Sequence, residues 1–138
     1  METEYKLCVN CGSARRLEKH HKIFRSQCKP LSHCKYNIAY LCQDCHRNKP
    51  YAVHNKHGHE LDLKLKLEFQ QWLEETFPLD RYTLDEIRKK LDISQNAVRS
   101  LSKLMNIDKG AYNRQEIIRA CMGGHVYIEE ELKNKDVI

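Results

Sequence analysis

The residues best suited to chemistry in this sequence begin with two cysteine pairs. Cys8 and Cys11 form one Cys-x-x-Cys pair, and Cys42 and Cys45 form a second pair farther along the chain. Each pair can place both sulfurs on one side of a tight turn, and the two pairs together can close a tetrahedral four-thiolate shell around Zn²⁺. Such a shell leaves no open coordination position, so we expect this zinc to be structural.

Four polar residues lie between these pairs or directly after them: His20, His21, Asn37 and His46. Hydrolysis of a phosphodiester needs a metal that neutralises charge on the phosphate, a base that activates water, and a group that orients the base. Histidine is suited to the role of base near pH 7. Adjacent residues of a strand point to opposite faces. His20 and His21 therefore share one site only if the strand bends or twists locally.

Taken together, these residues resemble a known family. The segments Cys8-Val-Asn-Cys11, His20-His21-Lys-Ile and Asn37-Ile-Ala-Tyr-Leu-Cys42-Gln-Asp-Cys45-His46 are similar to the HNH, or His-Me finger, nuclease motif in its zinc-stabilised form. The resemblance covers roughly residues 5 to 50. It implies a ββα-metal unit that cuts DNA by metal-dependent hydrolysis, leaving a 3′-hydroxyl and a 5′-phosphate.

The resemblance also implies a role for each residue of the motif. His21 would be the general base, and Asn37 would hold that histidine in orientation. His20 would be a ligand of the catalytic divalent metal, at a position that is Asp in many relatives, and His46 would be the final ligand. The four cysteines would hold Zn²⁺ away from the scissile phosphate.

The sequence departs from the family pattern in three respects. The interval from His21 to Asn37 is long, so it requires a loop insertion, and His54, His57 or His59 could replace His46 as a metal ligand. The expected catalytic metal is a divalent ion such as Mg²⁺ or Mn²⁺. Because a histidine stands where many relatives have an acid, we expect a preference for softer ions such as Mn²⁺, Ni²⁺ or Zn²⁺. Residues 53–66 look like the tail of phage-type members.

The elements that must position these residues follow from local patterns. We expect a strand over 17–24, a surface loop over 25–36, a strand over 37–41, and a short helix over 42–48 that Pro50 stops. Alternate residues of 61–69 are apolar, yet the same stretch fits one face of a helix, so we predict a helix from about 60 to 76. The fold class is α+β: a small ββα-metal finger stapled by structural zinc, then a mostly α-helical C-terminal region.

The C-terminal region has a pattern of its own. Thr83 and Glu86 form a capping box, and residues 83–101 resemble a helix-turn-helix. A third helix would begin near Asn113 and end at Gly123-Gly124, with a short β-type run over 125–128 and a frayed tail after it. We predict DNA contacts from the second of these helices, because these side chains can bond base edges or phosphates: Gln95, Asn96, Arg99 and Lys103. The alternative is a helical bundle that only supports the core or a dimer.

Composition is consistent with a polyanionic partner. The formal net charge of +5 comes mostly from the part of the chain up to Pro78, which also holds seven of the eight histidines. Nothing resembles a signal peptide, and no apolar run approaches the roughly twenty residues that a membrane span needs. We therefore expect a cytoplasmic protein, or one in the host cytoplasm if a phage encodes it, that contacts DNA and no membrane. A homodimer is compatible with this interpretation.

We predict three regions: a zinc-stabilised nuclease core over 1–60, a connecting helix over 61–78, and a helix-turn-helix-like domain over 79–138. The predicted function is that of an HNH endonuclease of phage or mobile-element origin. A non-catalytic zinc-ribbon or helix-turn-helix DNA-binding regulator is the alternative, in which the histidines are incidental. A structural adaptor that recruits a protein partner is a third interpretation.

Overall fold

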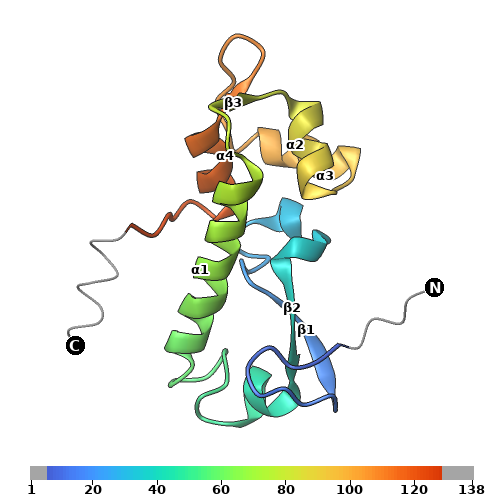
Figure 1. Ribbon diagram of the computed structural model, residues 1–138, viewed down its shortest axis with the longest axis vertical. Coiled ribbons are helices and arrows are strands. Elements are labelled where there is room, and N and C mark those ends of the chain that lie inside the picture. The colour runs from blue at the N-terminus through green and yellow to red at the C-terminus, as the bar shows by residue number, and fades with distance from the viewer. Residues whose placement is uncertain (1–5, 129–138) are drawn as a thin grey trace.

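A long helix and a two-stranded hairpin run side by side through much of the molecule, and short helices lie at one end (Figure 1). The computed structural model describes residues 6–128. The fold is a small α+β arrangement with two separate two-stranded antiparallel sheets. In chain order the elements are β1 Leu17–His21, η1 Lys29–Leu31, η2 Lys35–Asn37, β2 Ile38–Cys42, η3 Asp44–Asn48, α1 His59–Thr76, β3 Arg81–Tyr82, α2 Leu84–Leu91, α3 Gln95–Ser102, β4 Tyr112–Asn113 and α4 Arg114–Cys121.

The first sheet is the pair β1–β2, in the register Leu17↔Cys42 to His21↔Ile38. β1 ends at His21, three residues before the predicted end, because the chain turns there and the Lys22 N–H donates to the Asn37 carbonyl at 2.8 Å. After β2 the chain enters η3, a single π-helical turn at the place where a short helix was predicted. Strand, loop, strand and helical turn therefore follow in the predicted order.

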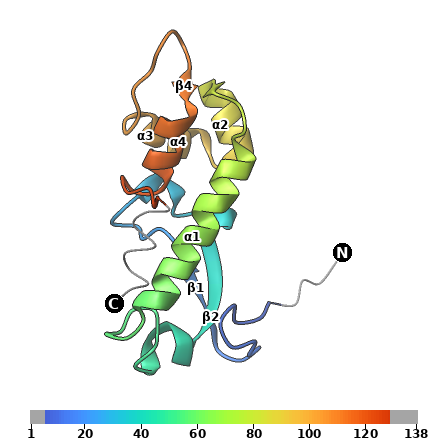
Figure 2. The ribbon, with the colours of Figure 1, turned by 60° about the vertical axis from the view of Figure 1, so that its left-hand side comes forward.

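The helix predicted from about 60 to 76 is confirmed as α1. Its apolar residues resolve the ambiguous pattern in favour of the helical period, since one face buries Leu61, Leu65, Phe69 and Leu73. Figure 2 shows α1 passing along the hairpin at one end and reaching the C-terminal helices at the other. The helix thus joins the two ends of the molecule.

The C-terminal helices begin at the caps that the sequence indicates. Thr83 and Glu86 form a reciprocal capping box on α2, Ser94 caps α3, and Asn113 caps α4. The turn between α2 and α3 has Asp92 in the left-handed conformation, at φ 53°. The β-type run predicted over 125–128 is wrong, because these residues form neither strand nor helix. The frayed tail predicted after it lies outside the described residues.

Two hydrophobic clusters hold the fold together. The smaller one surrounds the cysteine pairs and joins β2 to the first turns of α1 through Leu41, Leu61 and Leu65. The larger one joins the C-terminal helices and the second half of α1 to residues of the loop between β1 and β2, among them Ile23 and Leu31. Residues from the predicted 1–60 and 79–138 regions therefore share one core, and the boundaries of the three predicted regions stay a prediction.

The three cysteines outside the pairs belong to the larger cluster. Cys28, Cys34 and Cys121 are buried free thiols. Burial raises the pKa of Cys28 to about 11. A buried thiol in apolar surroundings stays protonated and unreactive at neutral pH, so these residues act as packing groups.

Candidate functional site

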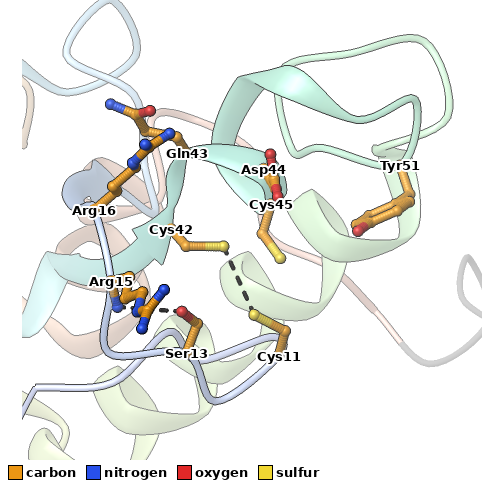
Figure 3. Close-up of a pocket in the computed structure, with 9 residues that line it drawn as sticks. All are labelled: Cys11, Ser13, Arg15, Arg16, Cys42, Gln43, Asp44, Cys45 and Tyr51. Atoms are coloured by element: carbon orange, nitrogen blue, oxygen red, sulfur yellow. Dashed lines mark hydrogen bonds between the residues drawn. The ribbon is translucent and has the colours of Figure 1, made fainter.

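The four paired cysteines converge at the end of the hairpin. Their sulfur atoms all lie within 4.8 Å of one another. Figure 3 shows three of them, with Cys11 on the N-terminal loop, Cys42 at the end of β2 and Cys45 in η3 all turned toward a common centre. The sulfurs of Cys11 and Cys42 are 3.6 Å apart. Two thiolates on one tetrahedral Zn²⁺ would be about 3.8 Å apart, given a Zn–S bond of about 2.3 Å, so the residues fit a structural zinc.

A turn at the N-terminus presents the first cysteine pair. The Cys8 N–H donates to the Ser13 carbonyl at 2.8 Å, the Gly12 N–H donates to the Cys8 carbonyl at 2.9 Å, and Gly12 takes φ +80°. That backbone angle favours glycine. Burial raises the pKa of the Cys8 thiol, but hydrogen bonds from the backbone of Cys42, Cys11 and Asn10 outweigh it and lower the pKa to about 6. Cys8 is therefore disposed to be a thiolate, the form that binds metal.

A second cluster contains three histidines. The nitrogen atoms of His20, His46 and His54 that could bind a metal all lie within 4.8 Å of one another. The Nε2 atoms of His46 and His54 are 3.0 Å apart. Two imidazoles on one metal would place their nitrogens about 2.9 to 3.4 Å apart, for metal–nitrogen bonds of about 2.0 to 2.1 Å. His54 therefore joins His46 in the cluster, whereas His57 and His59 are not part of it.

Burial and hydrogen bonding make these histidines suitable as ligands. His20 is 2% exposed, and its Nε2 atom is buried with no hydrogen-bond partner. Burial, together with the nearby charges of His54, His46, His21 and Lys66, lowers the pKa of His20 to about 3. Burial also lowers the pKa of His54. A neutral imidazole with an unpartnered buried nitrogen is a group that a metal ion would satisfy.

Glu18 supports the cluster from the side. Its Oε1 lies 2.9 Å from Nδ1 of His46, and its Oε2 accepts from Arg47 at 2.6 Å. When Nδ1 donates to this carboxylate, Nε2 of His46 carries a lone pair and faces His54. A carboxylate behind a ligating histidine fixes the tautomer and the ring orientation. Sequence analysis did not single out Glu18, although its spacing of two residues from His20 places both on one face of β1.

His21 lies beside this cluster but has a different partner. Its Nε2 is 2.8 Å from the Ser32 carbonyl oxygen, which can only accept, so Nε2 donates and Nδ1 is left with a lone pair. His21 lines a cleft of about 250 Å³ together with all three histidines of the cluster. β1 ends at His21, so His20 and His21 both reach this cleft although they are neighbours in the chain. A shared site needed such a local departure from strand geometry.

Asn37 is fully buried and uses its side chain to hold the loop after β1. Its Oδ1 accepts from the Ile23 N–H at 2.8 Å, and its Nδ2 donates to the carbonyls of Ile23 and Leu31. The Ser32 carbonyl that bonds His21 belongs to the same loop. Asn37 thus acts on the neighbourhood of His21 through the backbone, and its expected role in orienting that histidine stays a prediction.

The loop that carries His54 depends on a glycine at its end. Gly58 directly precedes α1, and a Cβ atom at this position would collide with the carbonyl of Ala52. The loop is closed further by Asn55, whose side chain donates to the carbonyls of Arg47 and Lys49 at 2.7 Å. These contacts fix the chain between η3 and α1, and so bring His54 back onto His46.

The residues predicted to contact DNA lie on the helical end of the molecule. Gln95, Asn96 and Arg99 are exposed on α3, and Lys103 is exposed at its C-terminal cap. α3 turns Val98 and Leu101 into the larger cluster. The polar face that a recognition helix would use is therefore open, while its use in DNA binding stays a prediction.

Comparisons with protein-family models, with curated proteins and with solved structures found no match. Among the described residues, no helix is long and apolar enough to cross a membrane.

Proposed function

We propose that this protein is a metal-dependent endonuclease of the HNH type that hydrolyses DNA phosphodiester bonds. The observation that carries the proposal is the cluster of His20, His46 and His54, which includes an unpartnered buried nitrogen on His20, beside a fourth histidine whose Nε2 bonds the Ser32 carbonyl. The hairpin and the helical turn after it would then be a ββα-metal unit. Glu18 bonds Nδ1 of His46 and leaves Nε2 of that ring facing His54.

The three clustered histidines would hold the catalytic divalent metal. When bound there, the metal supplies Lewis-acid neutralisation of a phosphate oxygen and of the leaving group. An all-nitrogen ligand set favours Mn²⁺, Ni²⁺ or Zn²⁺ over Mg²⁺. Cys8, Cys11, Cys42 and Cys45 would hold a separate zinc whose role is structural, because four thiolates leave no position for substrate.

His21 would act as the general base. Its Nε2–H bond to the Ser32 carbonyl holds the ring in place and leaves Nδ1 to take a proton from water. The Ser32 carbonyl also stabilises the charged ring that results, because Nε2–H becomes a stronger donor once Nδ1 is protonated. Arg25 lines the same cleft and offers a cation for a phosphate oxygen.

The test is plasmid cleavage by the zinc-loaded protein. Supercoiled DNA is incubated with Mg²⁺, Mn²⁺, Ni²⁺ or Zn²⁺, and with a chelator, for the wild type, His21→Ala and the control His57→Ala. We expect metal-dependent nicking by the wild type and by His57→Ala, because His57 is exposed and outside the cluster. His21→Ala should be slower by about 10²- to 10⁴-fold, the contribution of a general base.

The exposed polar face of α3 favours a second candidate, a DNA-binding regulator that does not cut. In that case the wild type binds DNA, and no divalent metal produces nicking that His21→Ala could lose. An adaptor for a protein partner would show negligible DNA affinity as well. Either result would overturn the nuclease proposal.

A further inference from the structure

The solvent-facing side of the β1–β2 hairpin carries a different set of residues from the side that faces α1. Strand alternation turns His20 and Ala39, which form a register pair, into the protein. On the opposite side, Lys19 pairs with Tyr40 and His21 pairs with Ile38. Lys19 is exposed, and His21, Ile38 and Tyr40 are half-buried. His21 therefore shares its face with a lysine and a tyrosine.

This face forms one wall of a groove of about 640 Å³. Among the described residues, the groove is lined by basic side chains, two tyrosines and Ile38, and by no carboxylate. The basic and aromatic lining residues are Lys6, Lys19, His33, Lys35, Tyr36 and Tyr40.

Internal contacts hold the two tyrosines of the groove in place. The Tyr36 ring stacks on Trp72 of α1, with ring centroids 4.3 Å apart and planes 20° apart. Lys6 Nζ donates to the Tyr40 hydroxyl at 2.9 Å and lies 4.5 Å from the centre of its ring. The groove thus has rigid aromatic walls, and Lys6 is fixed over one of them.

The groove and the histidine cleft share a lining residue. Lys19 lines both hollows, and His21 lies one register pair farther along the same face. The loop that supplies the Ser32 carbonyl to His21 supplies the next residue, His33, to the groove. A polyanion with regularly spaced charges could place one charge in the histidine cleft. Its neighbouring charges would then lie beside the basic side chains of the groove.

We propose that this groove binds the DNA backbone next to the scissile phosphate, an inference that rests on the proposed function. Lysine side chains neutralise phosphates without reading sequence, and aromatic side chains pack against sugars or unstacked bases. Lys35 Nζ is paired with Asp92 at 3.3 Å, so the test leaves this residue in place. Lys6 and Lys19 are the phosphate contacts that the test removes. Lys19 lies on β1 and Lys6 lies before it in the chain, bonded to Tyr40 of β2, so neither belongs to the α3 residues that the sequence indicates.

The experiment measures DNA binding without cleavage, in a His21→Ala background of the full zinc-loaded chain. Affinity for a short fluorescent duplex is determined by anisotropy over a series of KCl concentrations. The variant pair is Lys6→Gln with Lys19→Gln, and the control pair is Lys56→Gln with Lys109→Gln, two exposed lysines outside the groove that change net charge equally. Circular dichroism confirms that each protein folds.

We expect the groove pair to weaken binding to all sequences alike and to reduce the slope of log affinity against log salt by about 2, one for each lost phosphate contact. The control pair should leave the slope unchanged. If the two pairs give equal slopes and the wild type cleaves plasmid, the groove proposal is overturned and the nuclease proposal stands. If only the groove pair lowers the slope and the wild type does not cleave, the nuclease proposal is overturned and the groove remains a DNA-binding surface. Absence of DNA binding overturns both.

Discussion

The orientation of each imidazole decides what the histidine cluster can do. Glu18 accepts from Nδ1 of His46, and the Ser32 carbonyl accepts from Nε2 of His21. These two bonds engage opposite ring nitrogens, so Nε2 of His46 faces His54 and Nδ1 of His21 is the nitrogen that the Ser32 carbonyl does not bond. Under the proposed function, these two acceptors would determine which histidine binds the metal and which acts as the base.

Removal of the Glu18 carboxylate should weaken metal binding without removing a ligand. For Glu18→Ala we expect the affinity of the histidine cluster for Ni²⁺ to fall by about 10- to 100-fold, the usual effect of losing a carboxylate behind a ligating histidine. Calorimetric titration of Ni²⁺ into the zinc-loaded protein measures this. Glu60→Ala, an exposed glutamate of α1, is the matched control. Unchanged affinity in Glu18→Ala would show that the carboxylate does not position His46.

At the residue scale, spacing predicted the cysteine cluster because both pairs are local and their geometry repeats between proteins. Spacing could not decide whether His54, His57 or His59 is the additional metal ligand. The fold of the loop before α1 decides this, because it brings His54 next to His46. The hydrogen bond between His21 and the Ser32 carbonyl could not have been predicted, because the acceptor is a backbone group and the identity of the side chain does not indicate it.

Among the elements, α2 shows most directly how local sequence fixes a boundary. The Thr83 hydroxyl accepts from the Glu86 N–H, and the Glu86 carboxylate accepts from the Thr83 N–H at 2.9 Å. α2 packs Ile87 and Leu91 into the larger cluster and precedes the turn into α3. The start of α2 therefore affects how α3 is presented.

We expect Thr83→Ala to lower the free energy of unfolding by about 1 kcal/mol, the typical effect of removing an N-cap side chain. Urea unfolding of the zinc-loaded protein measures it. Ser100→Ala, an exposed serine inside α3, is the control and should change stability little. Equal stability of wild type and Thr83→Ala would mean that the cap is replaced by water at no cost.

The other half of the capping box should respond to pH. Hydrogen bonds from Thr83 lower the pKa of Glu86 below its ordinary value of 4.5. A carboxyl whose folded-state pKa is lowered stabilises the fold above the unfolded-state pKa, and this contribution is lost as pH falls through the folded-state pKa. The stability difference between wild type and Glu86→Gln should therefore be largest near neutral pH and shrink below about pH 4.5. Urea unfolding of both proteins across this range checks the trend, and a constant difference would contradict it.

Elements with strong local signals were predicted with accurate bounds, and those set by tertiary contacts were not. α1 and the caps of α2, α3 and α4 follow from periodicity and capping residues. The end of β1 depends on the bonds from Asn37 to Ile23 across the loop, which no local pattern reveals. The run over 125–128 has strand-type residues but no partner strand among the described residues, so propensity alone did not make it a strand.

At the scale of the whole molecule, the four-cysteine cluster and the larger hydrophobic cluster are supported by different residues. The smaller cluster around the cysteines contains no aromatic side chain among its buried members, whereas Phe69, Phe77 and Tyr82 fill the larger one. Zinc removal should therefore disorder the smaller end first. Because Cys45 and His46 are consecutive in η3, disorder at the cysteine end should also disrupt the histidine cluster.

We expect Cys11→Ser to bind less zinc and to lose metal binding at the histidine cluster, while Trp72 fluorescence stays as in the wild type. Trp72 stacks on Tyr36 and Phe69 in the larger cluster, so its emission reports that end. Cys11 is exposed, so its replacement removes a ligand and little packing. Ser13→Ala is the control. A red-shifted Trp72 emission in Cys11→Ser would show instead that the two ends unfold as one unit.

The packing of the loop between β1 and β2 against the C-terminal helices was beyond sequence reasoning. Ile23 and Leu31 lie 60 or more positions before Leu91 and Leu101 in the sequence, and hydrophobic residues alone do not specify their partners. The predicted separation into a nuclease core and a helical appendage treated the loop as surface. The structure instead buries three of its side chains, Cys28, Leu31 and Cys34, while Arg25 to Gln27 stay exposed.

The close approach of Gly58 to the Ala52 carbonyl has a consequence for how freely this chain can vary. The obstacle there is main chain, so no smaller neighbour at another position would make room for a methyl group. Any other amino acid at position 58 would therefore require a different backbone path for the loop between η3 and α1. A residue with no reactive atom would then rank with the imidazoles among the least replaceable in the protein.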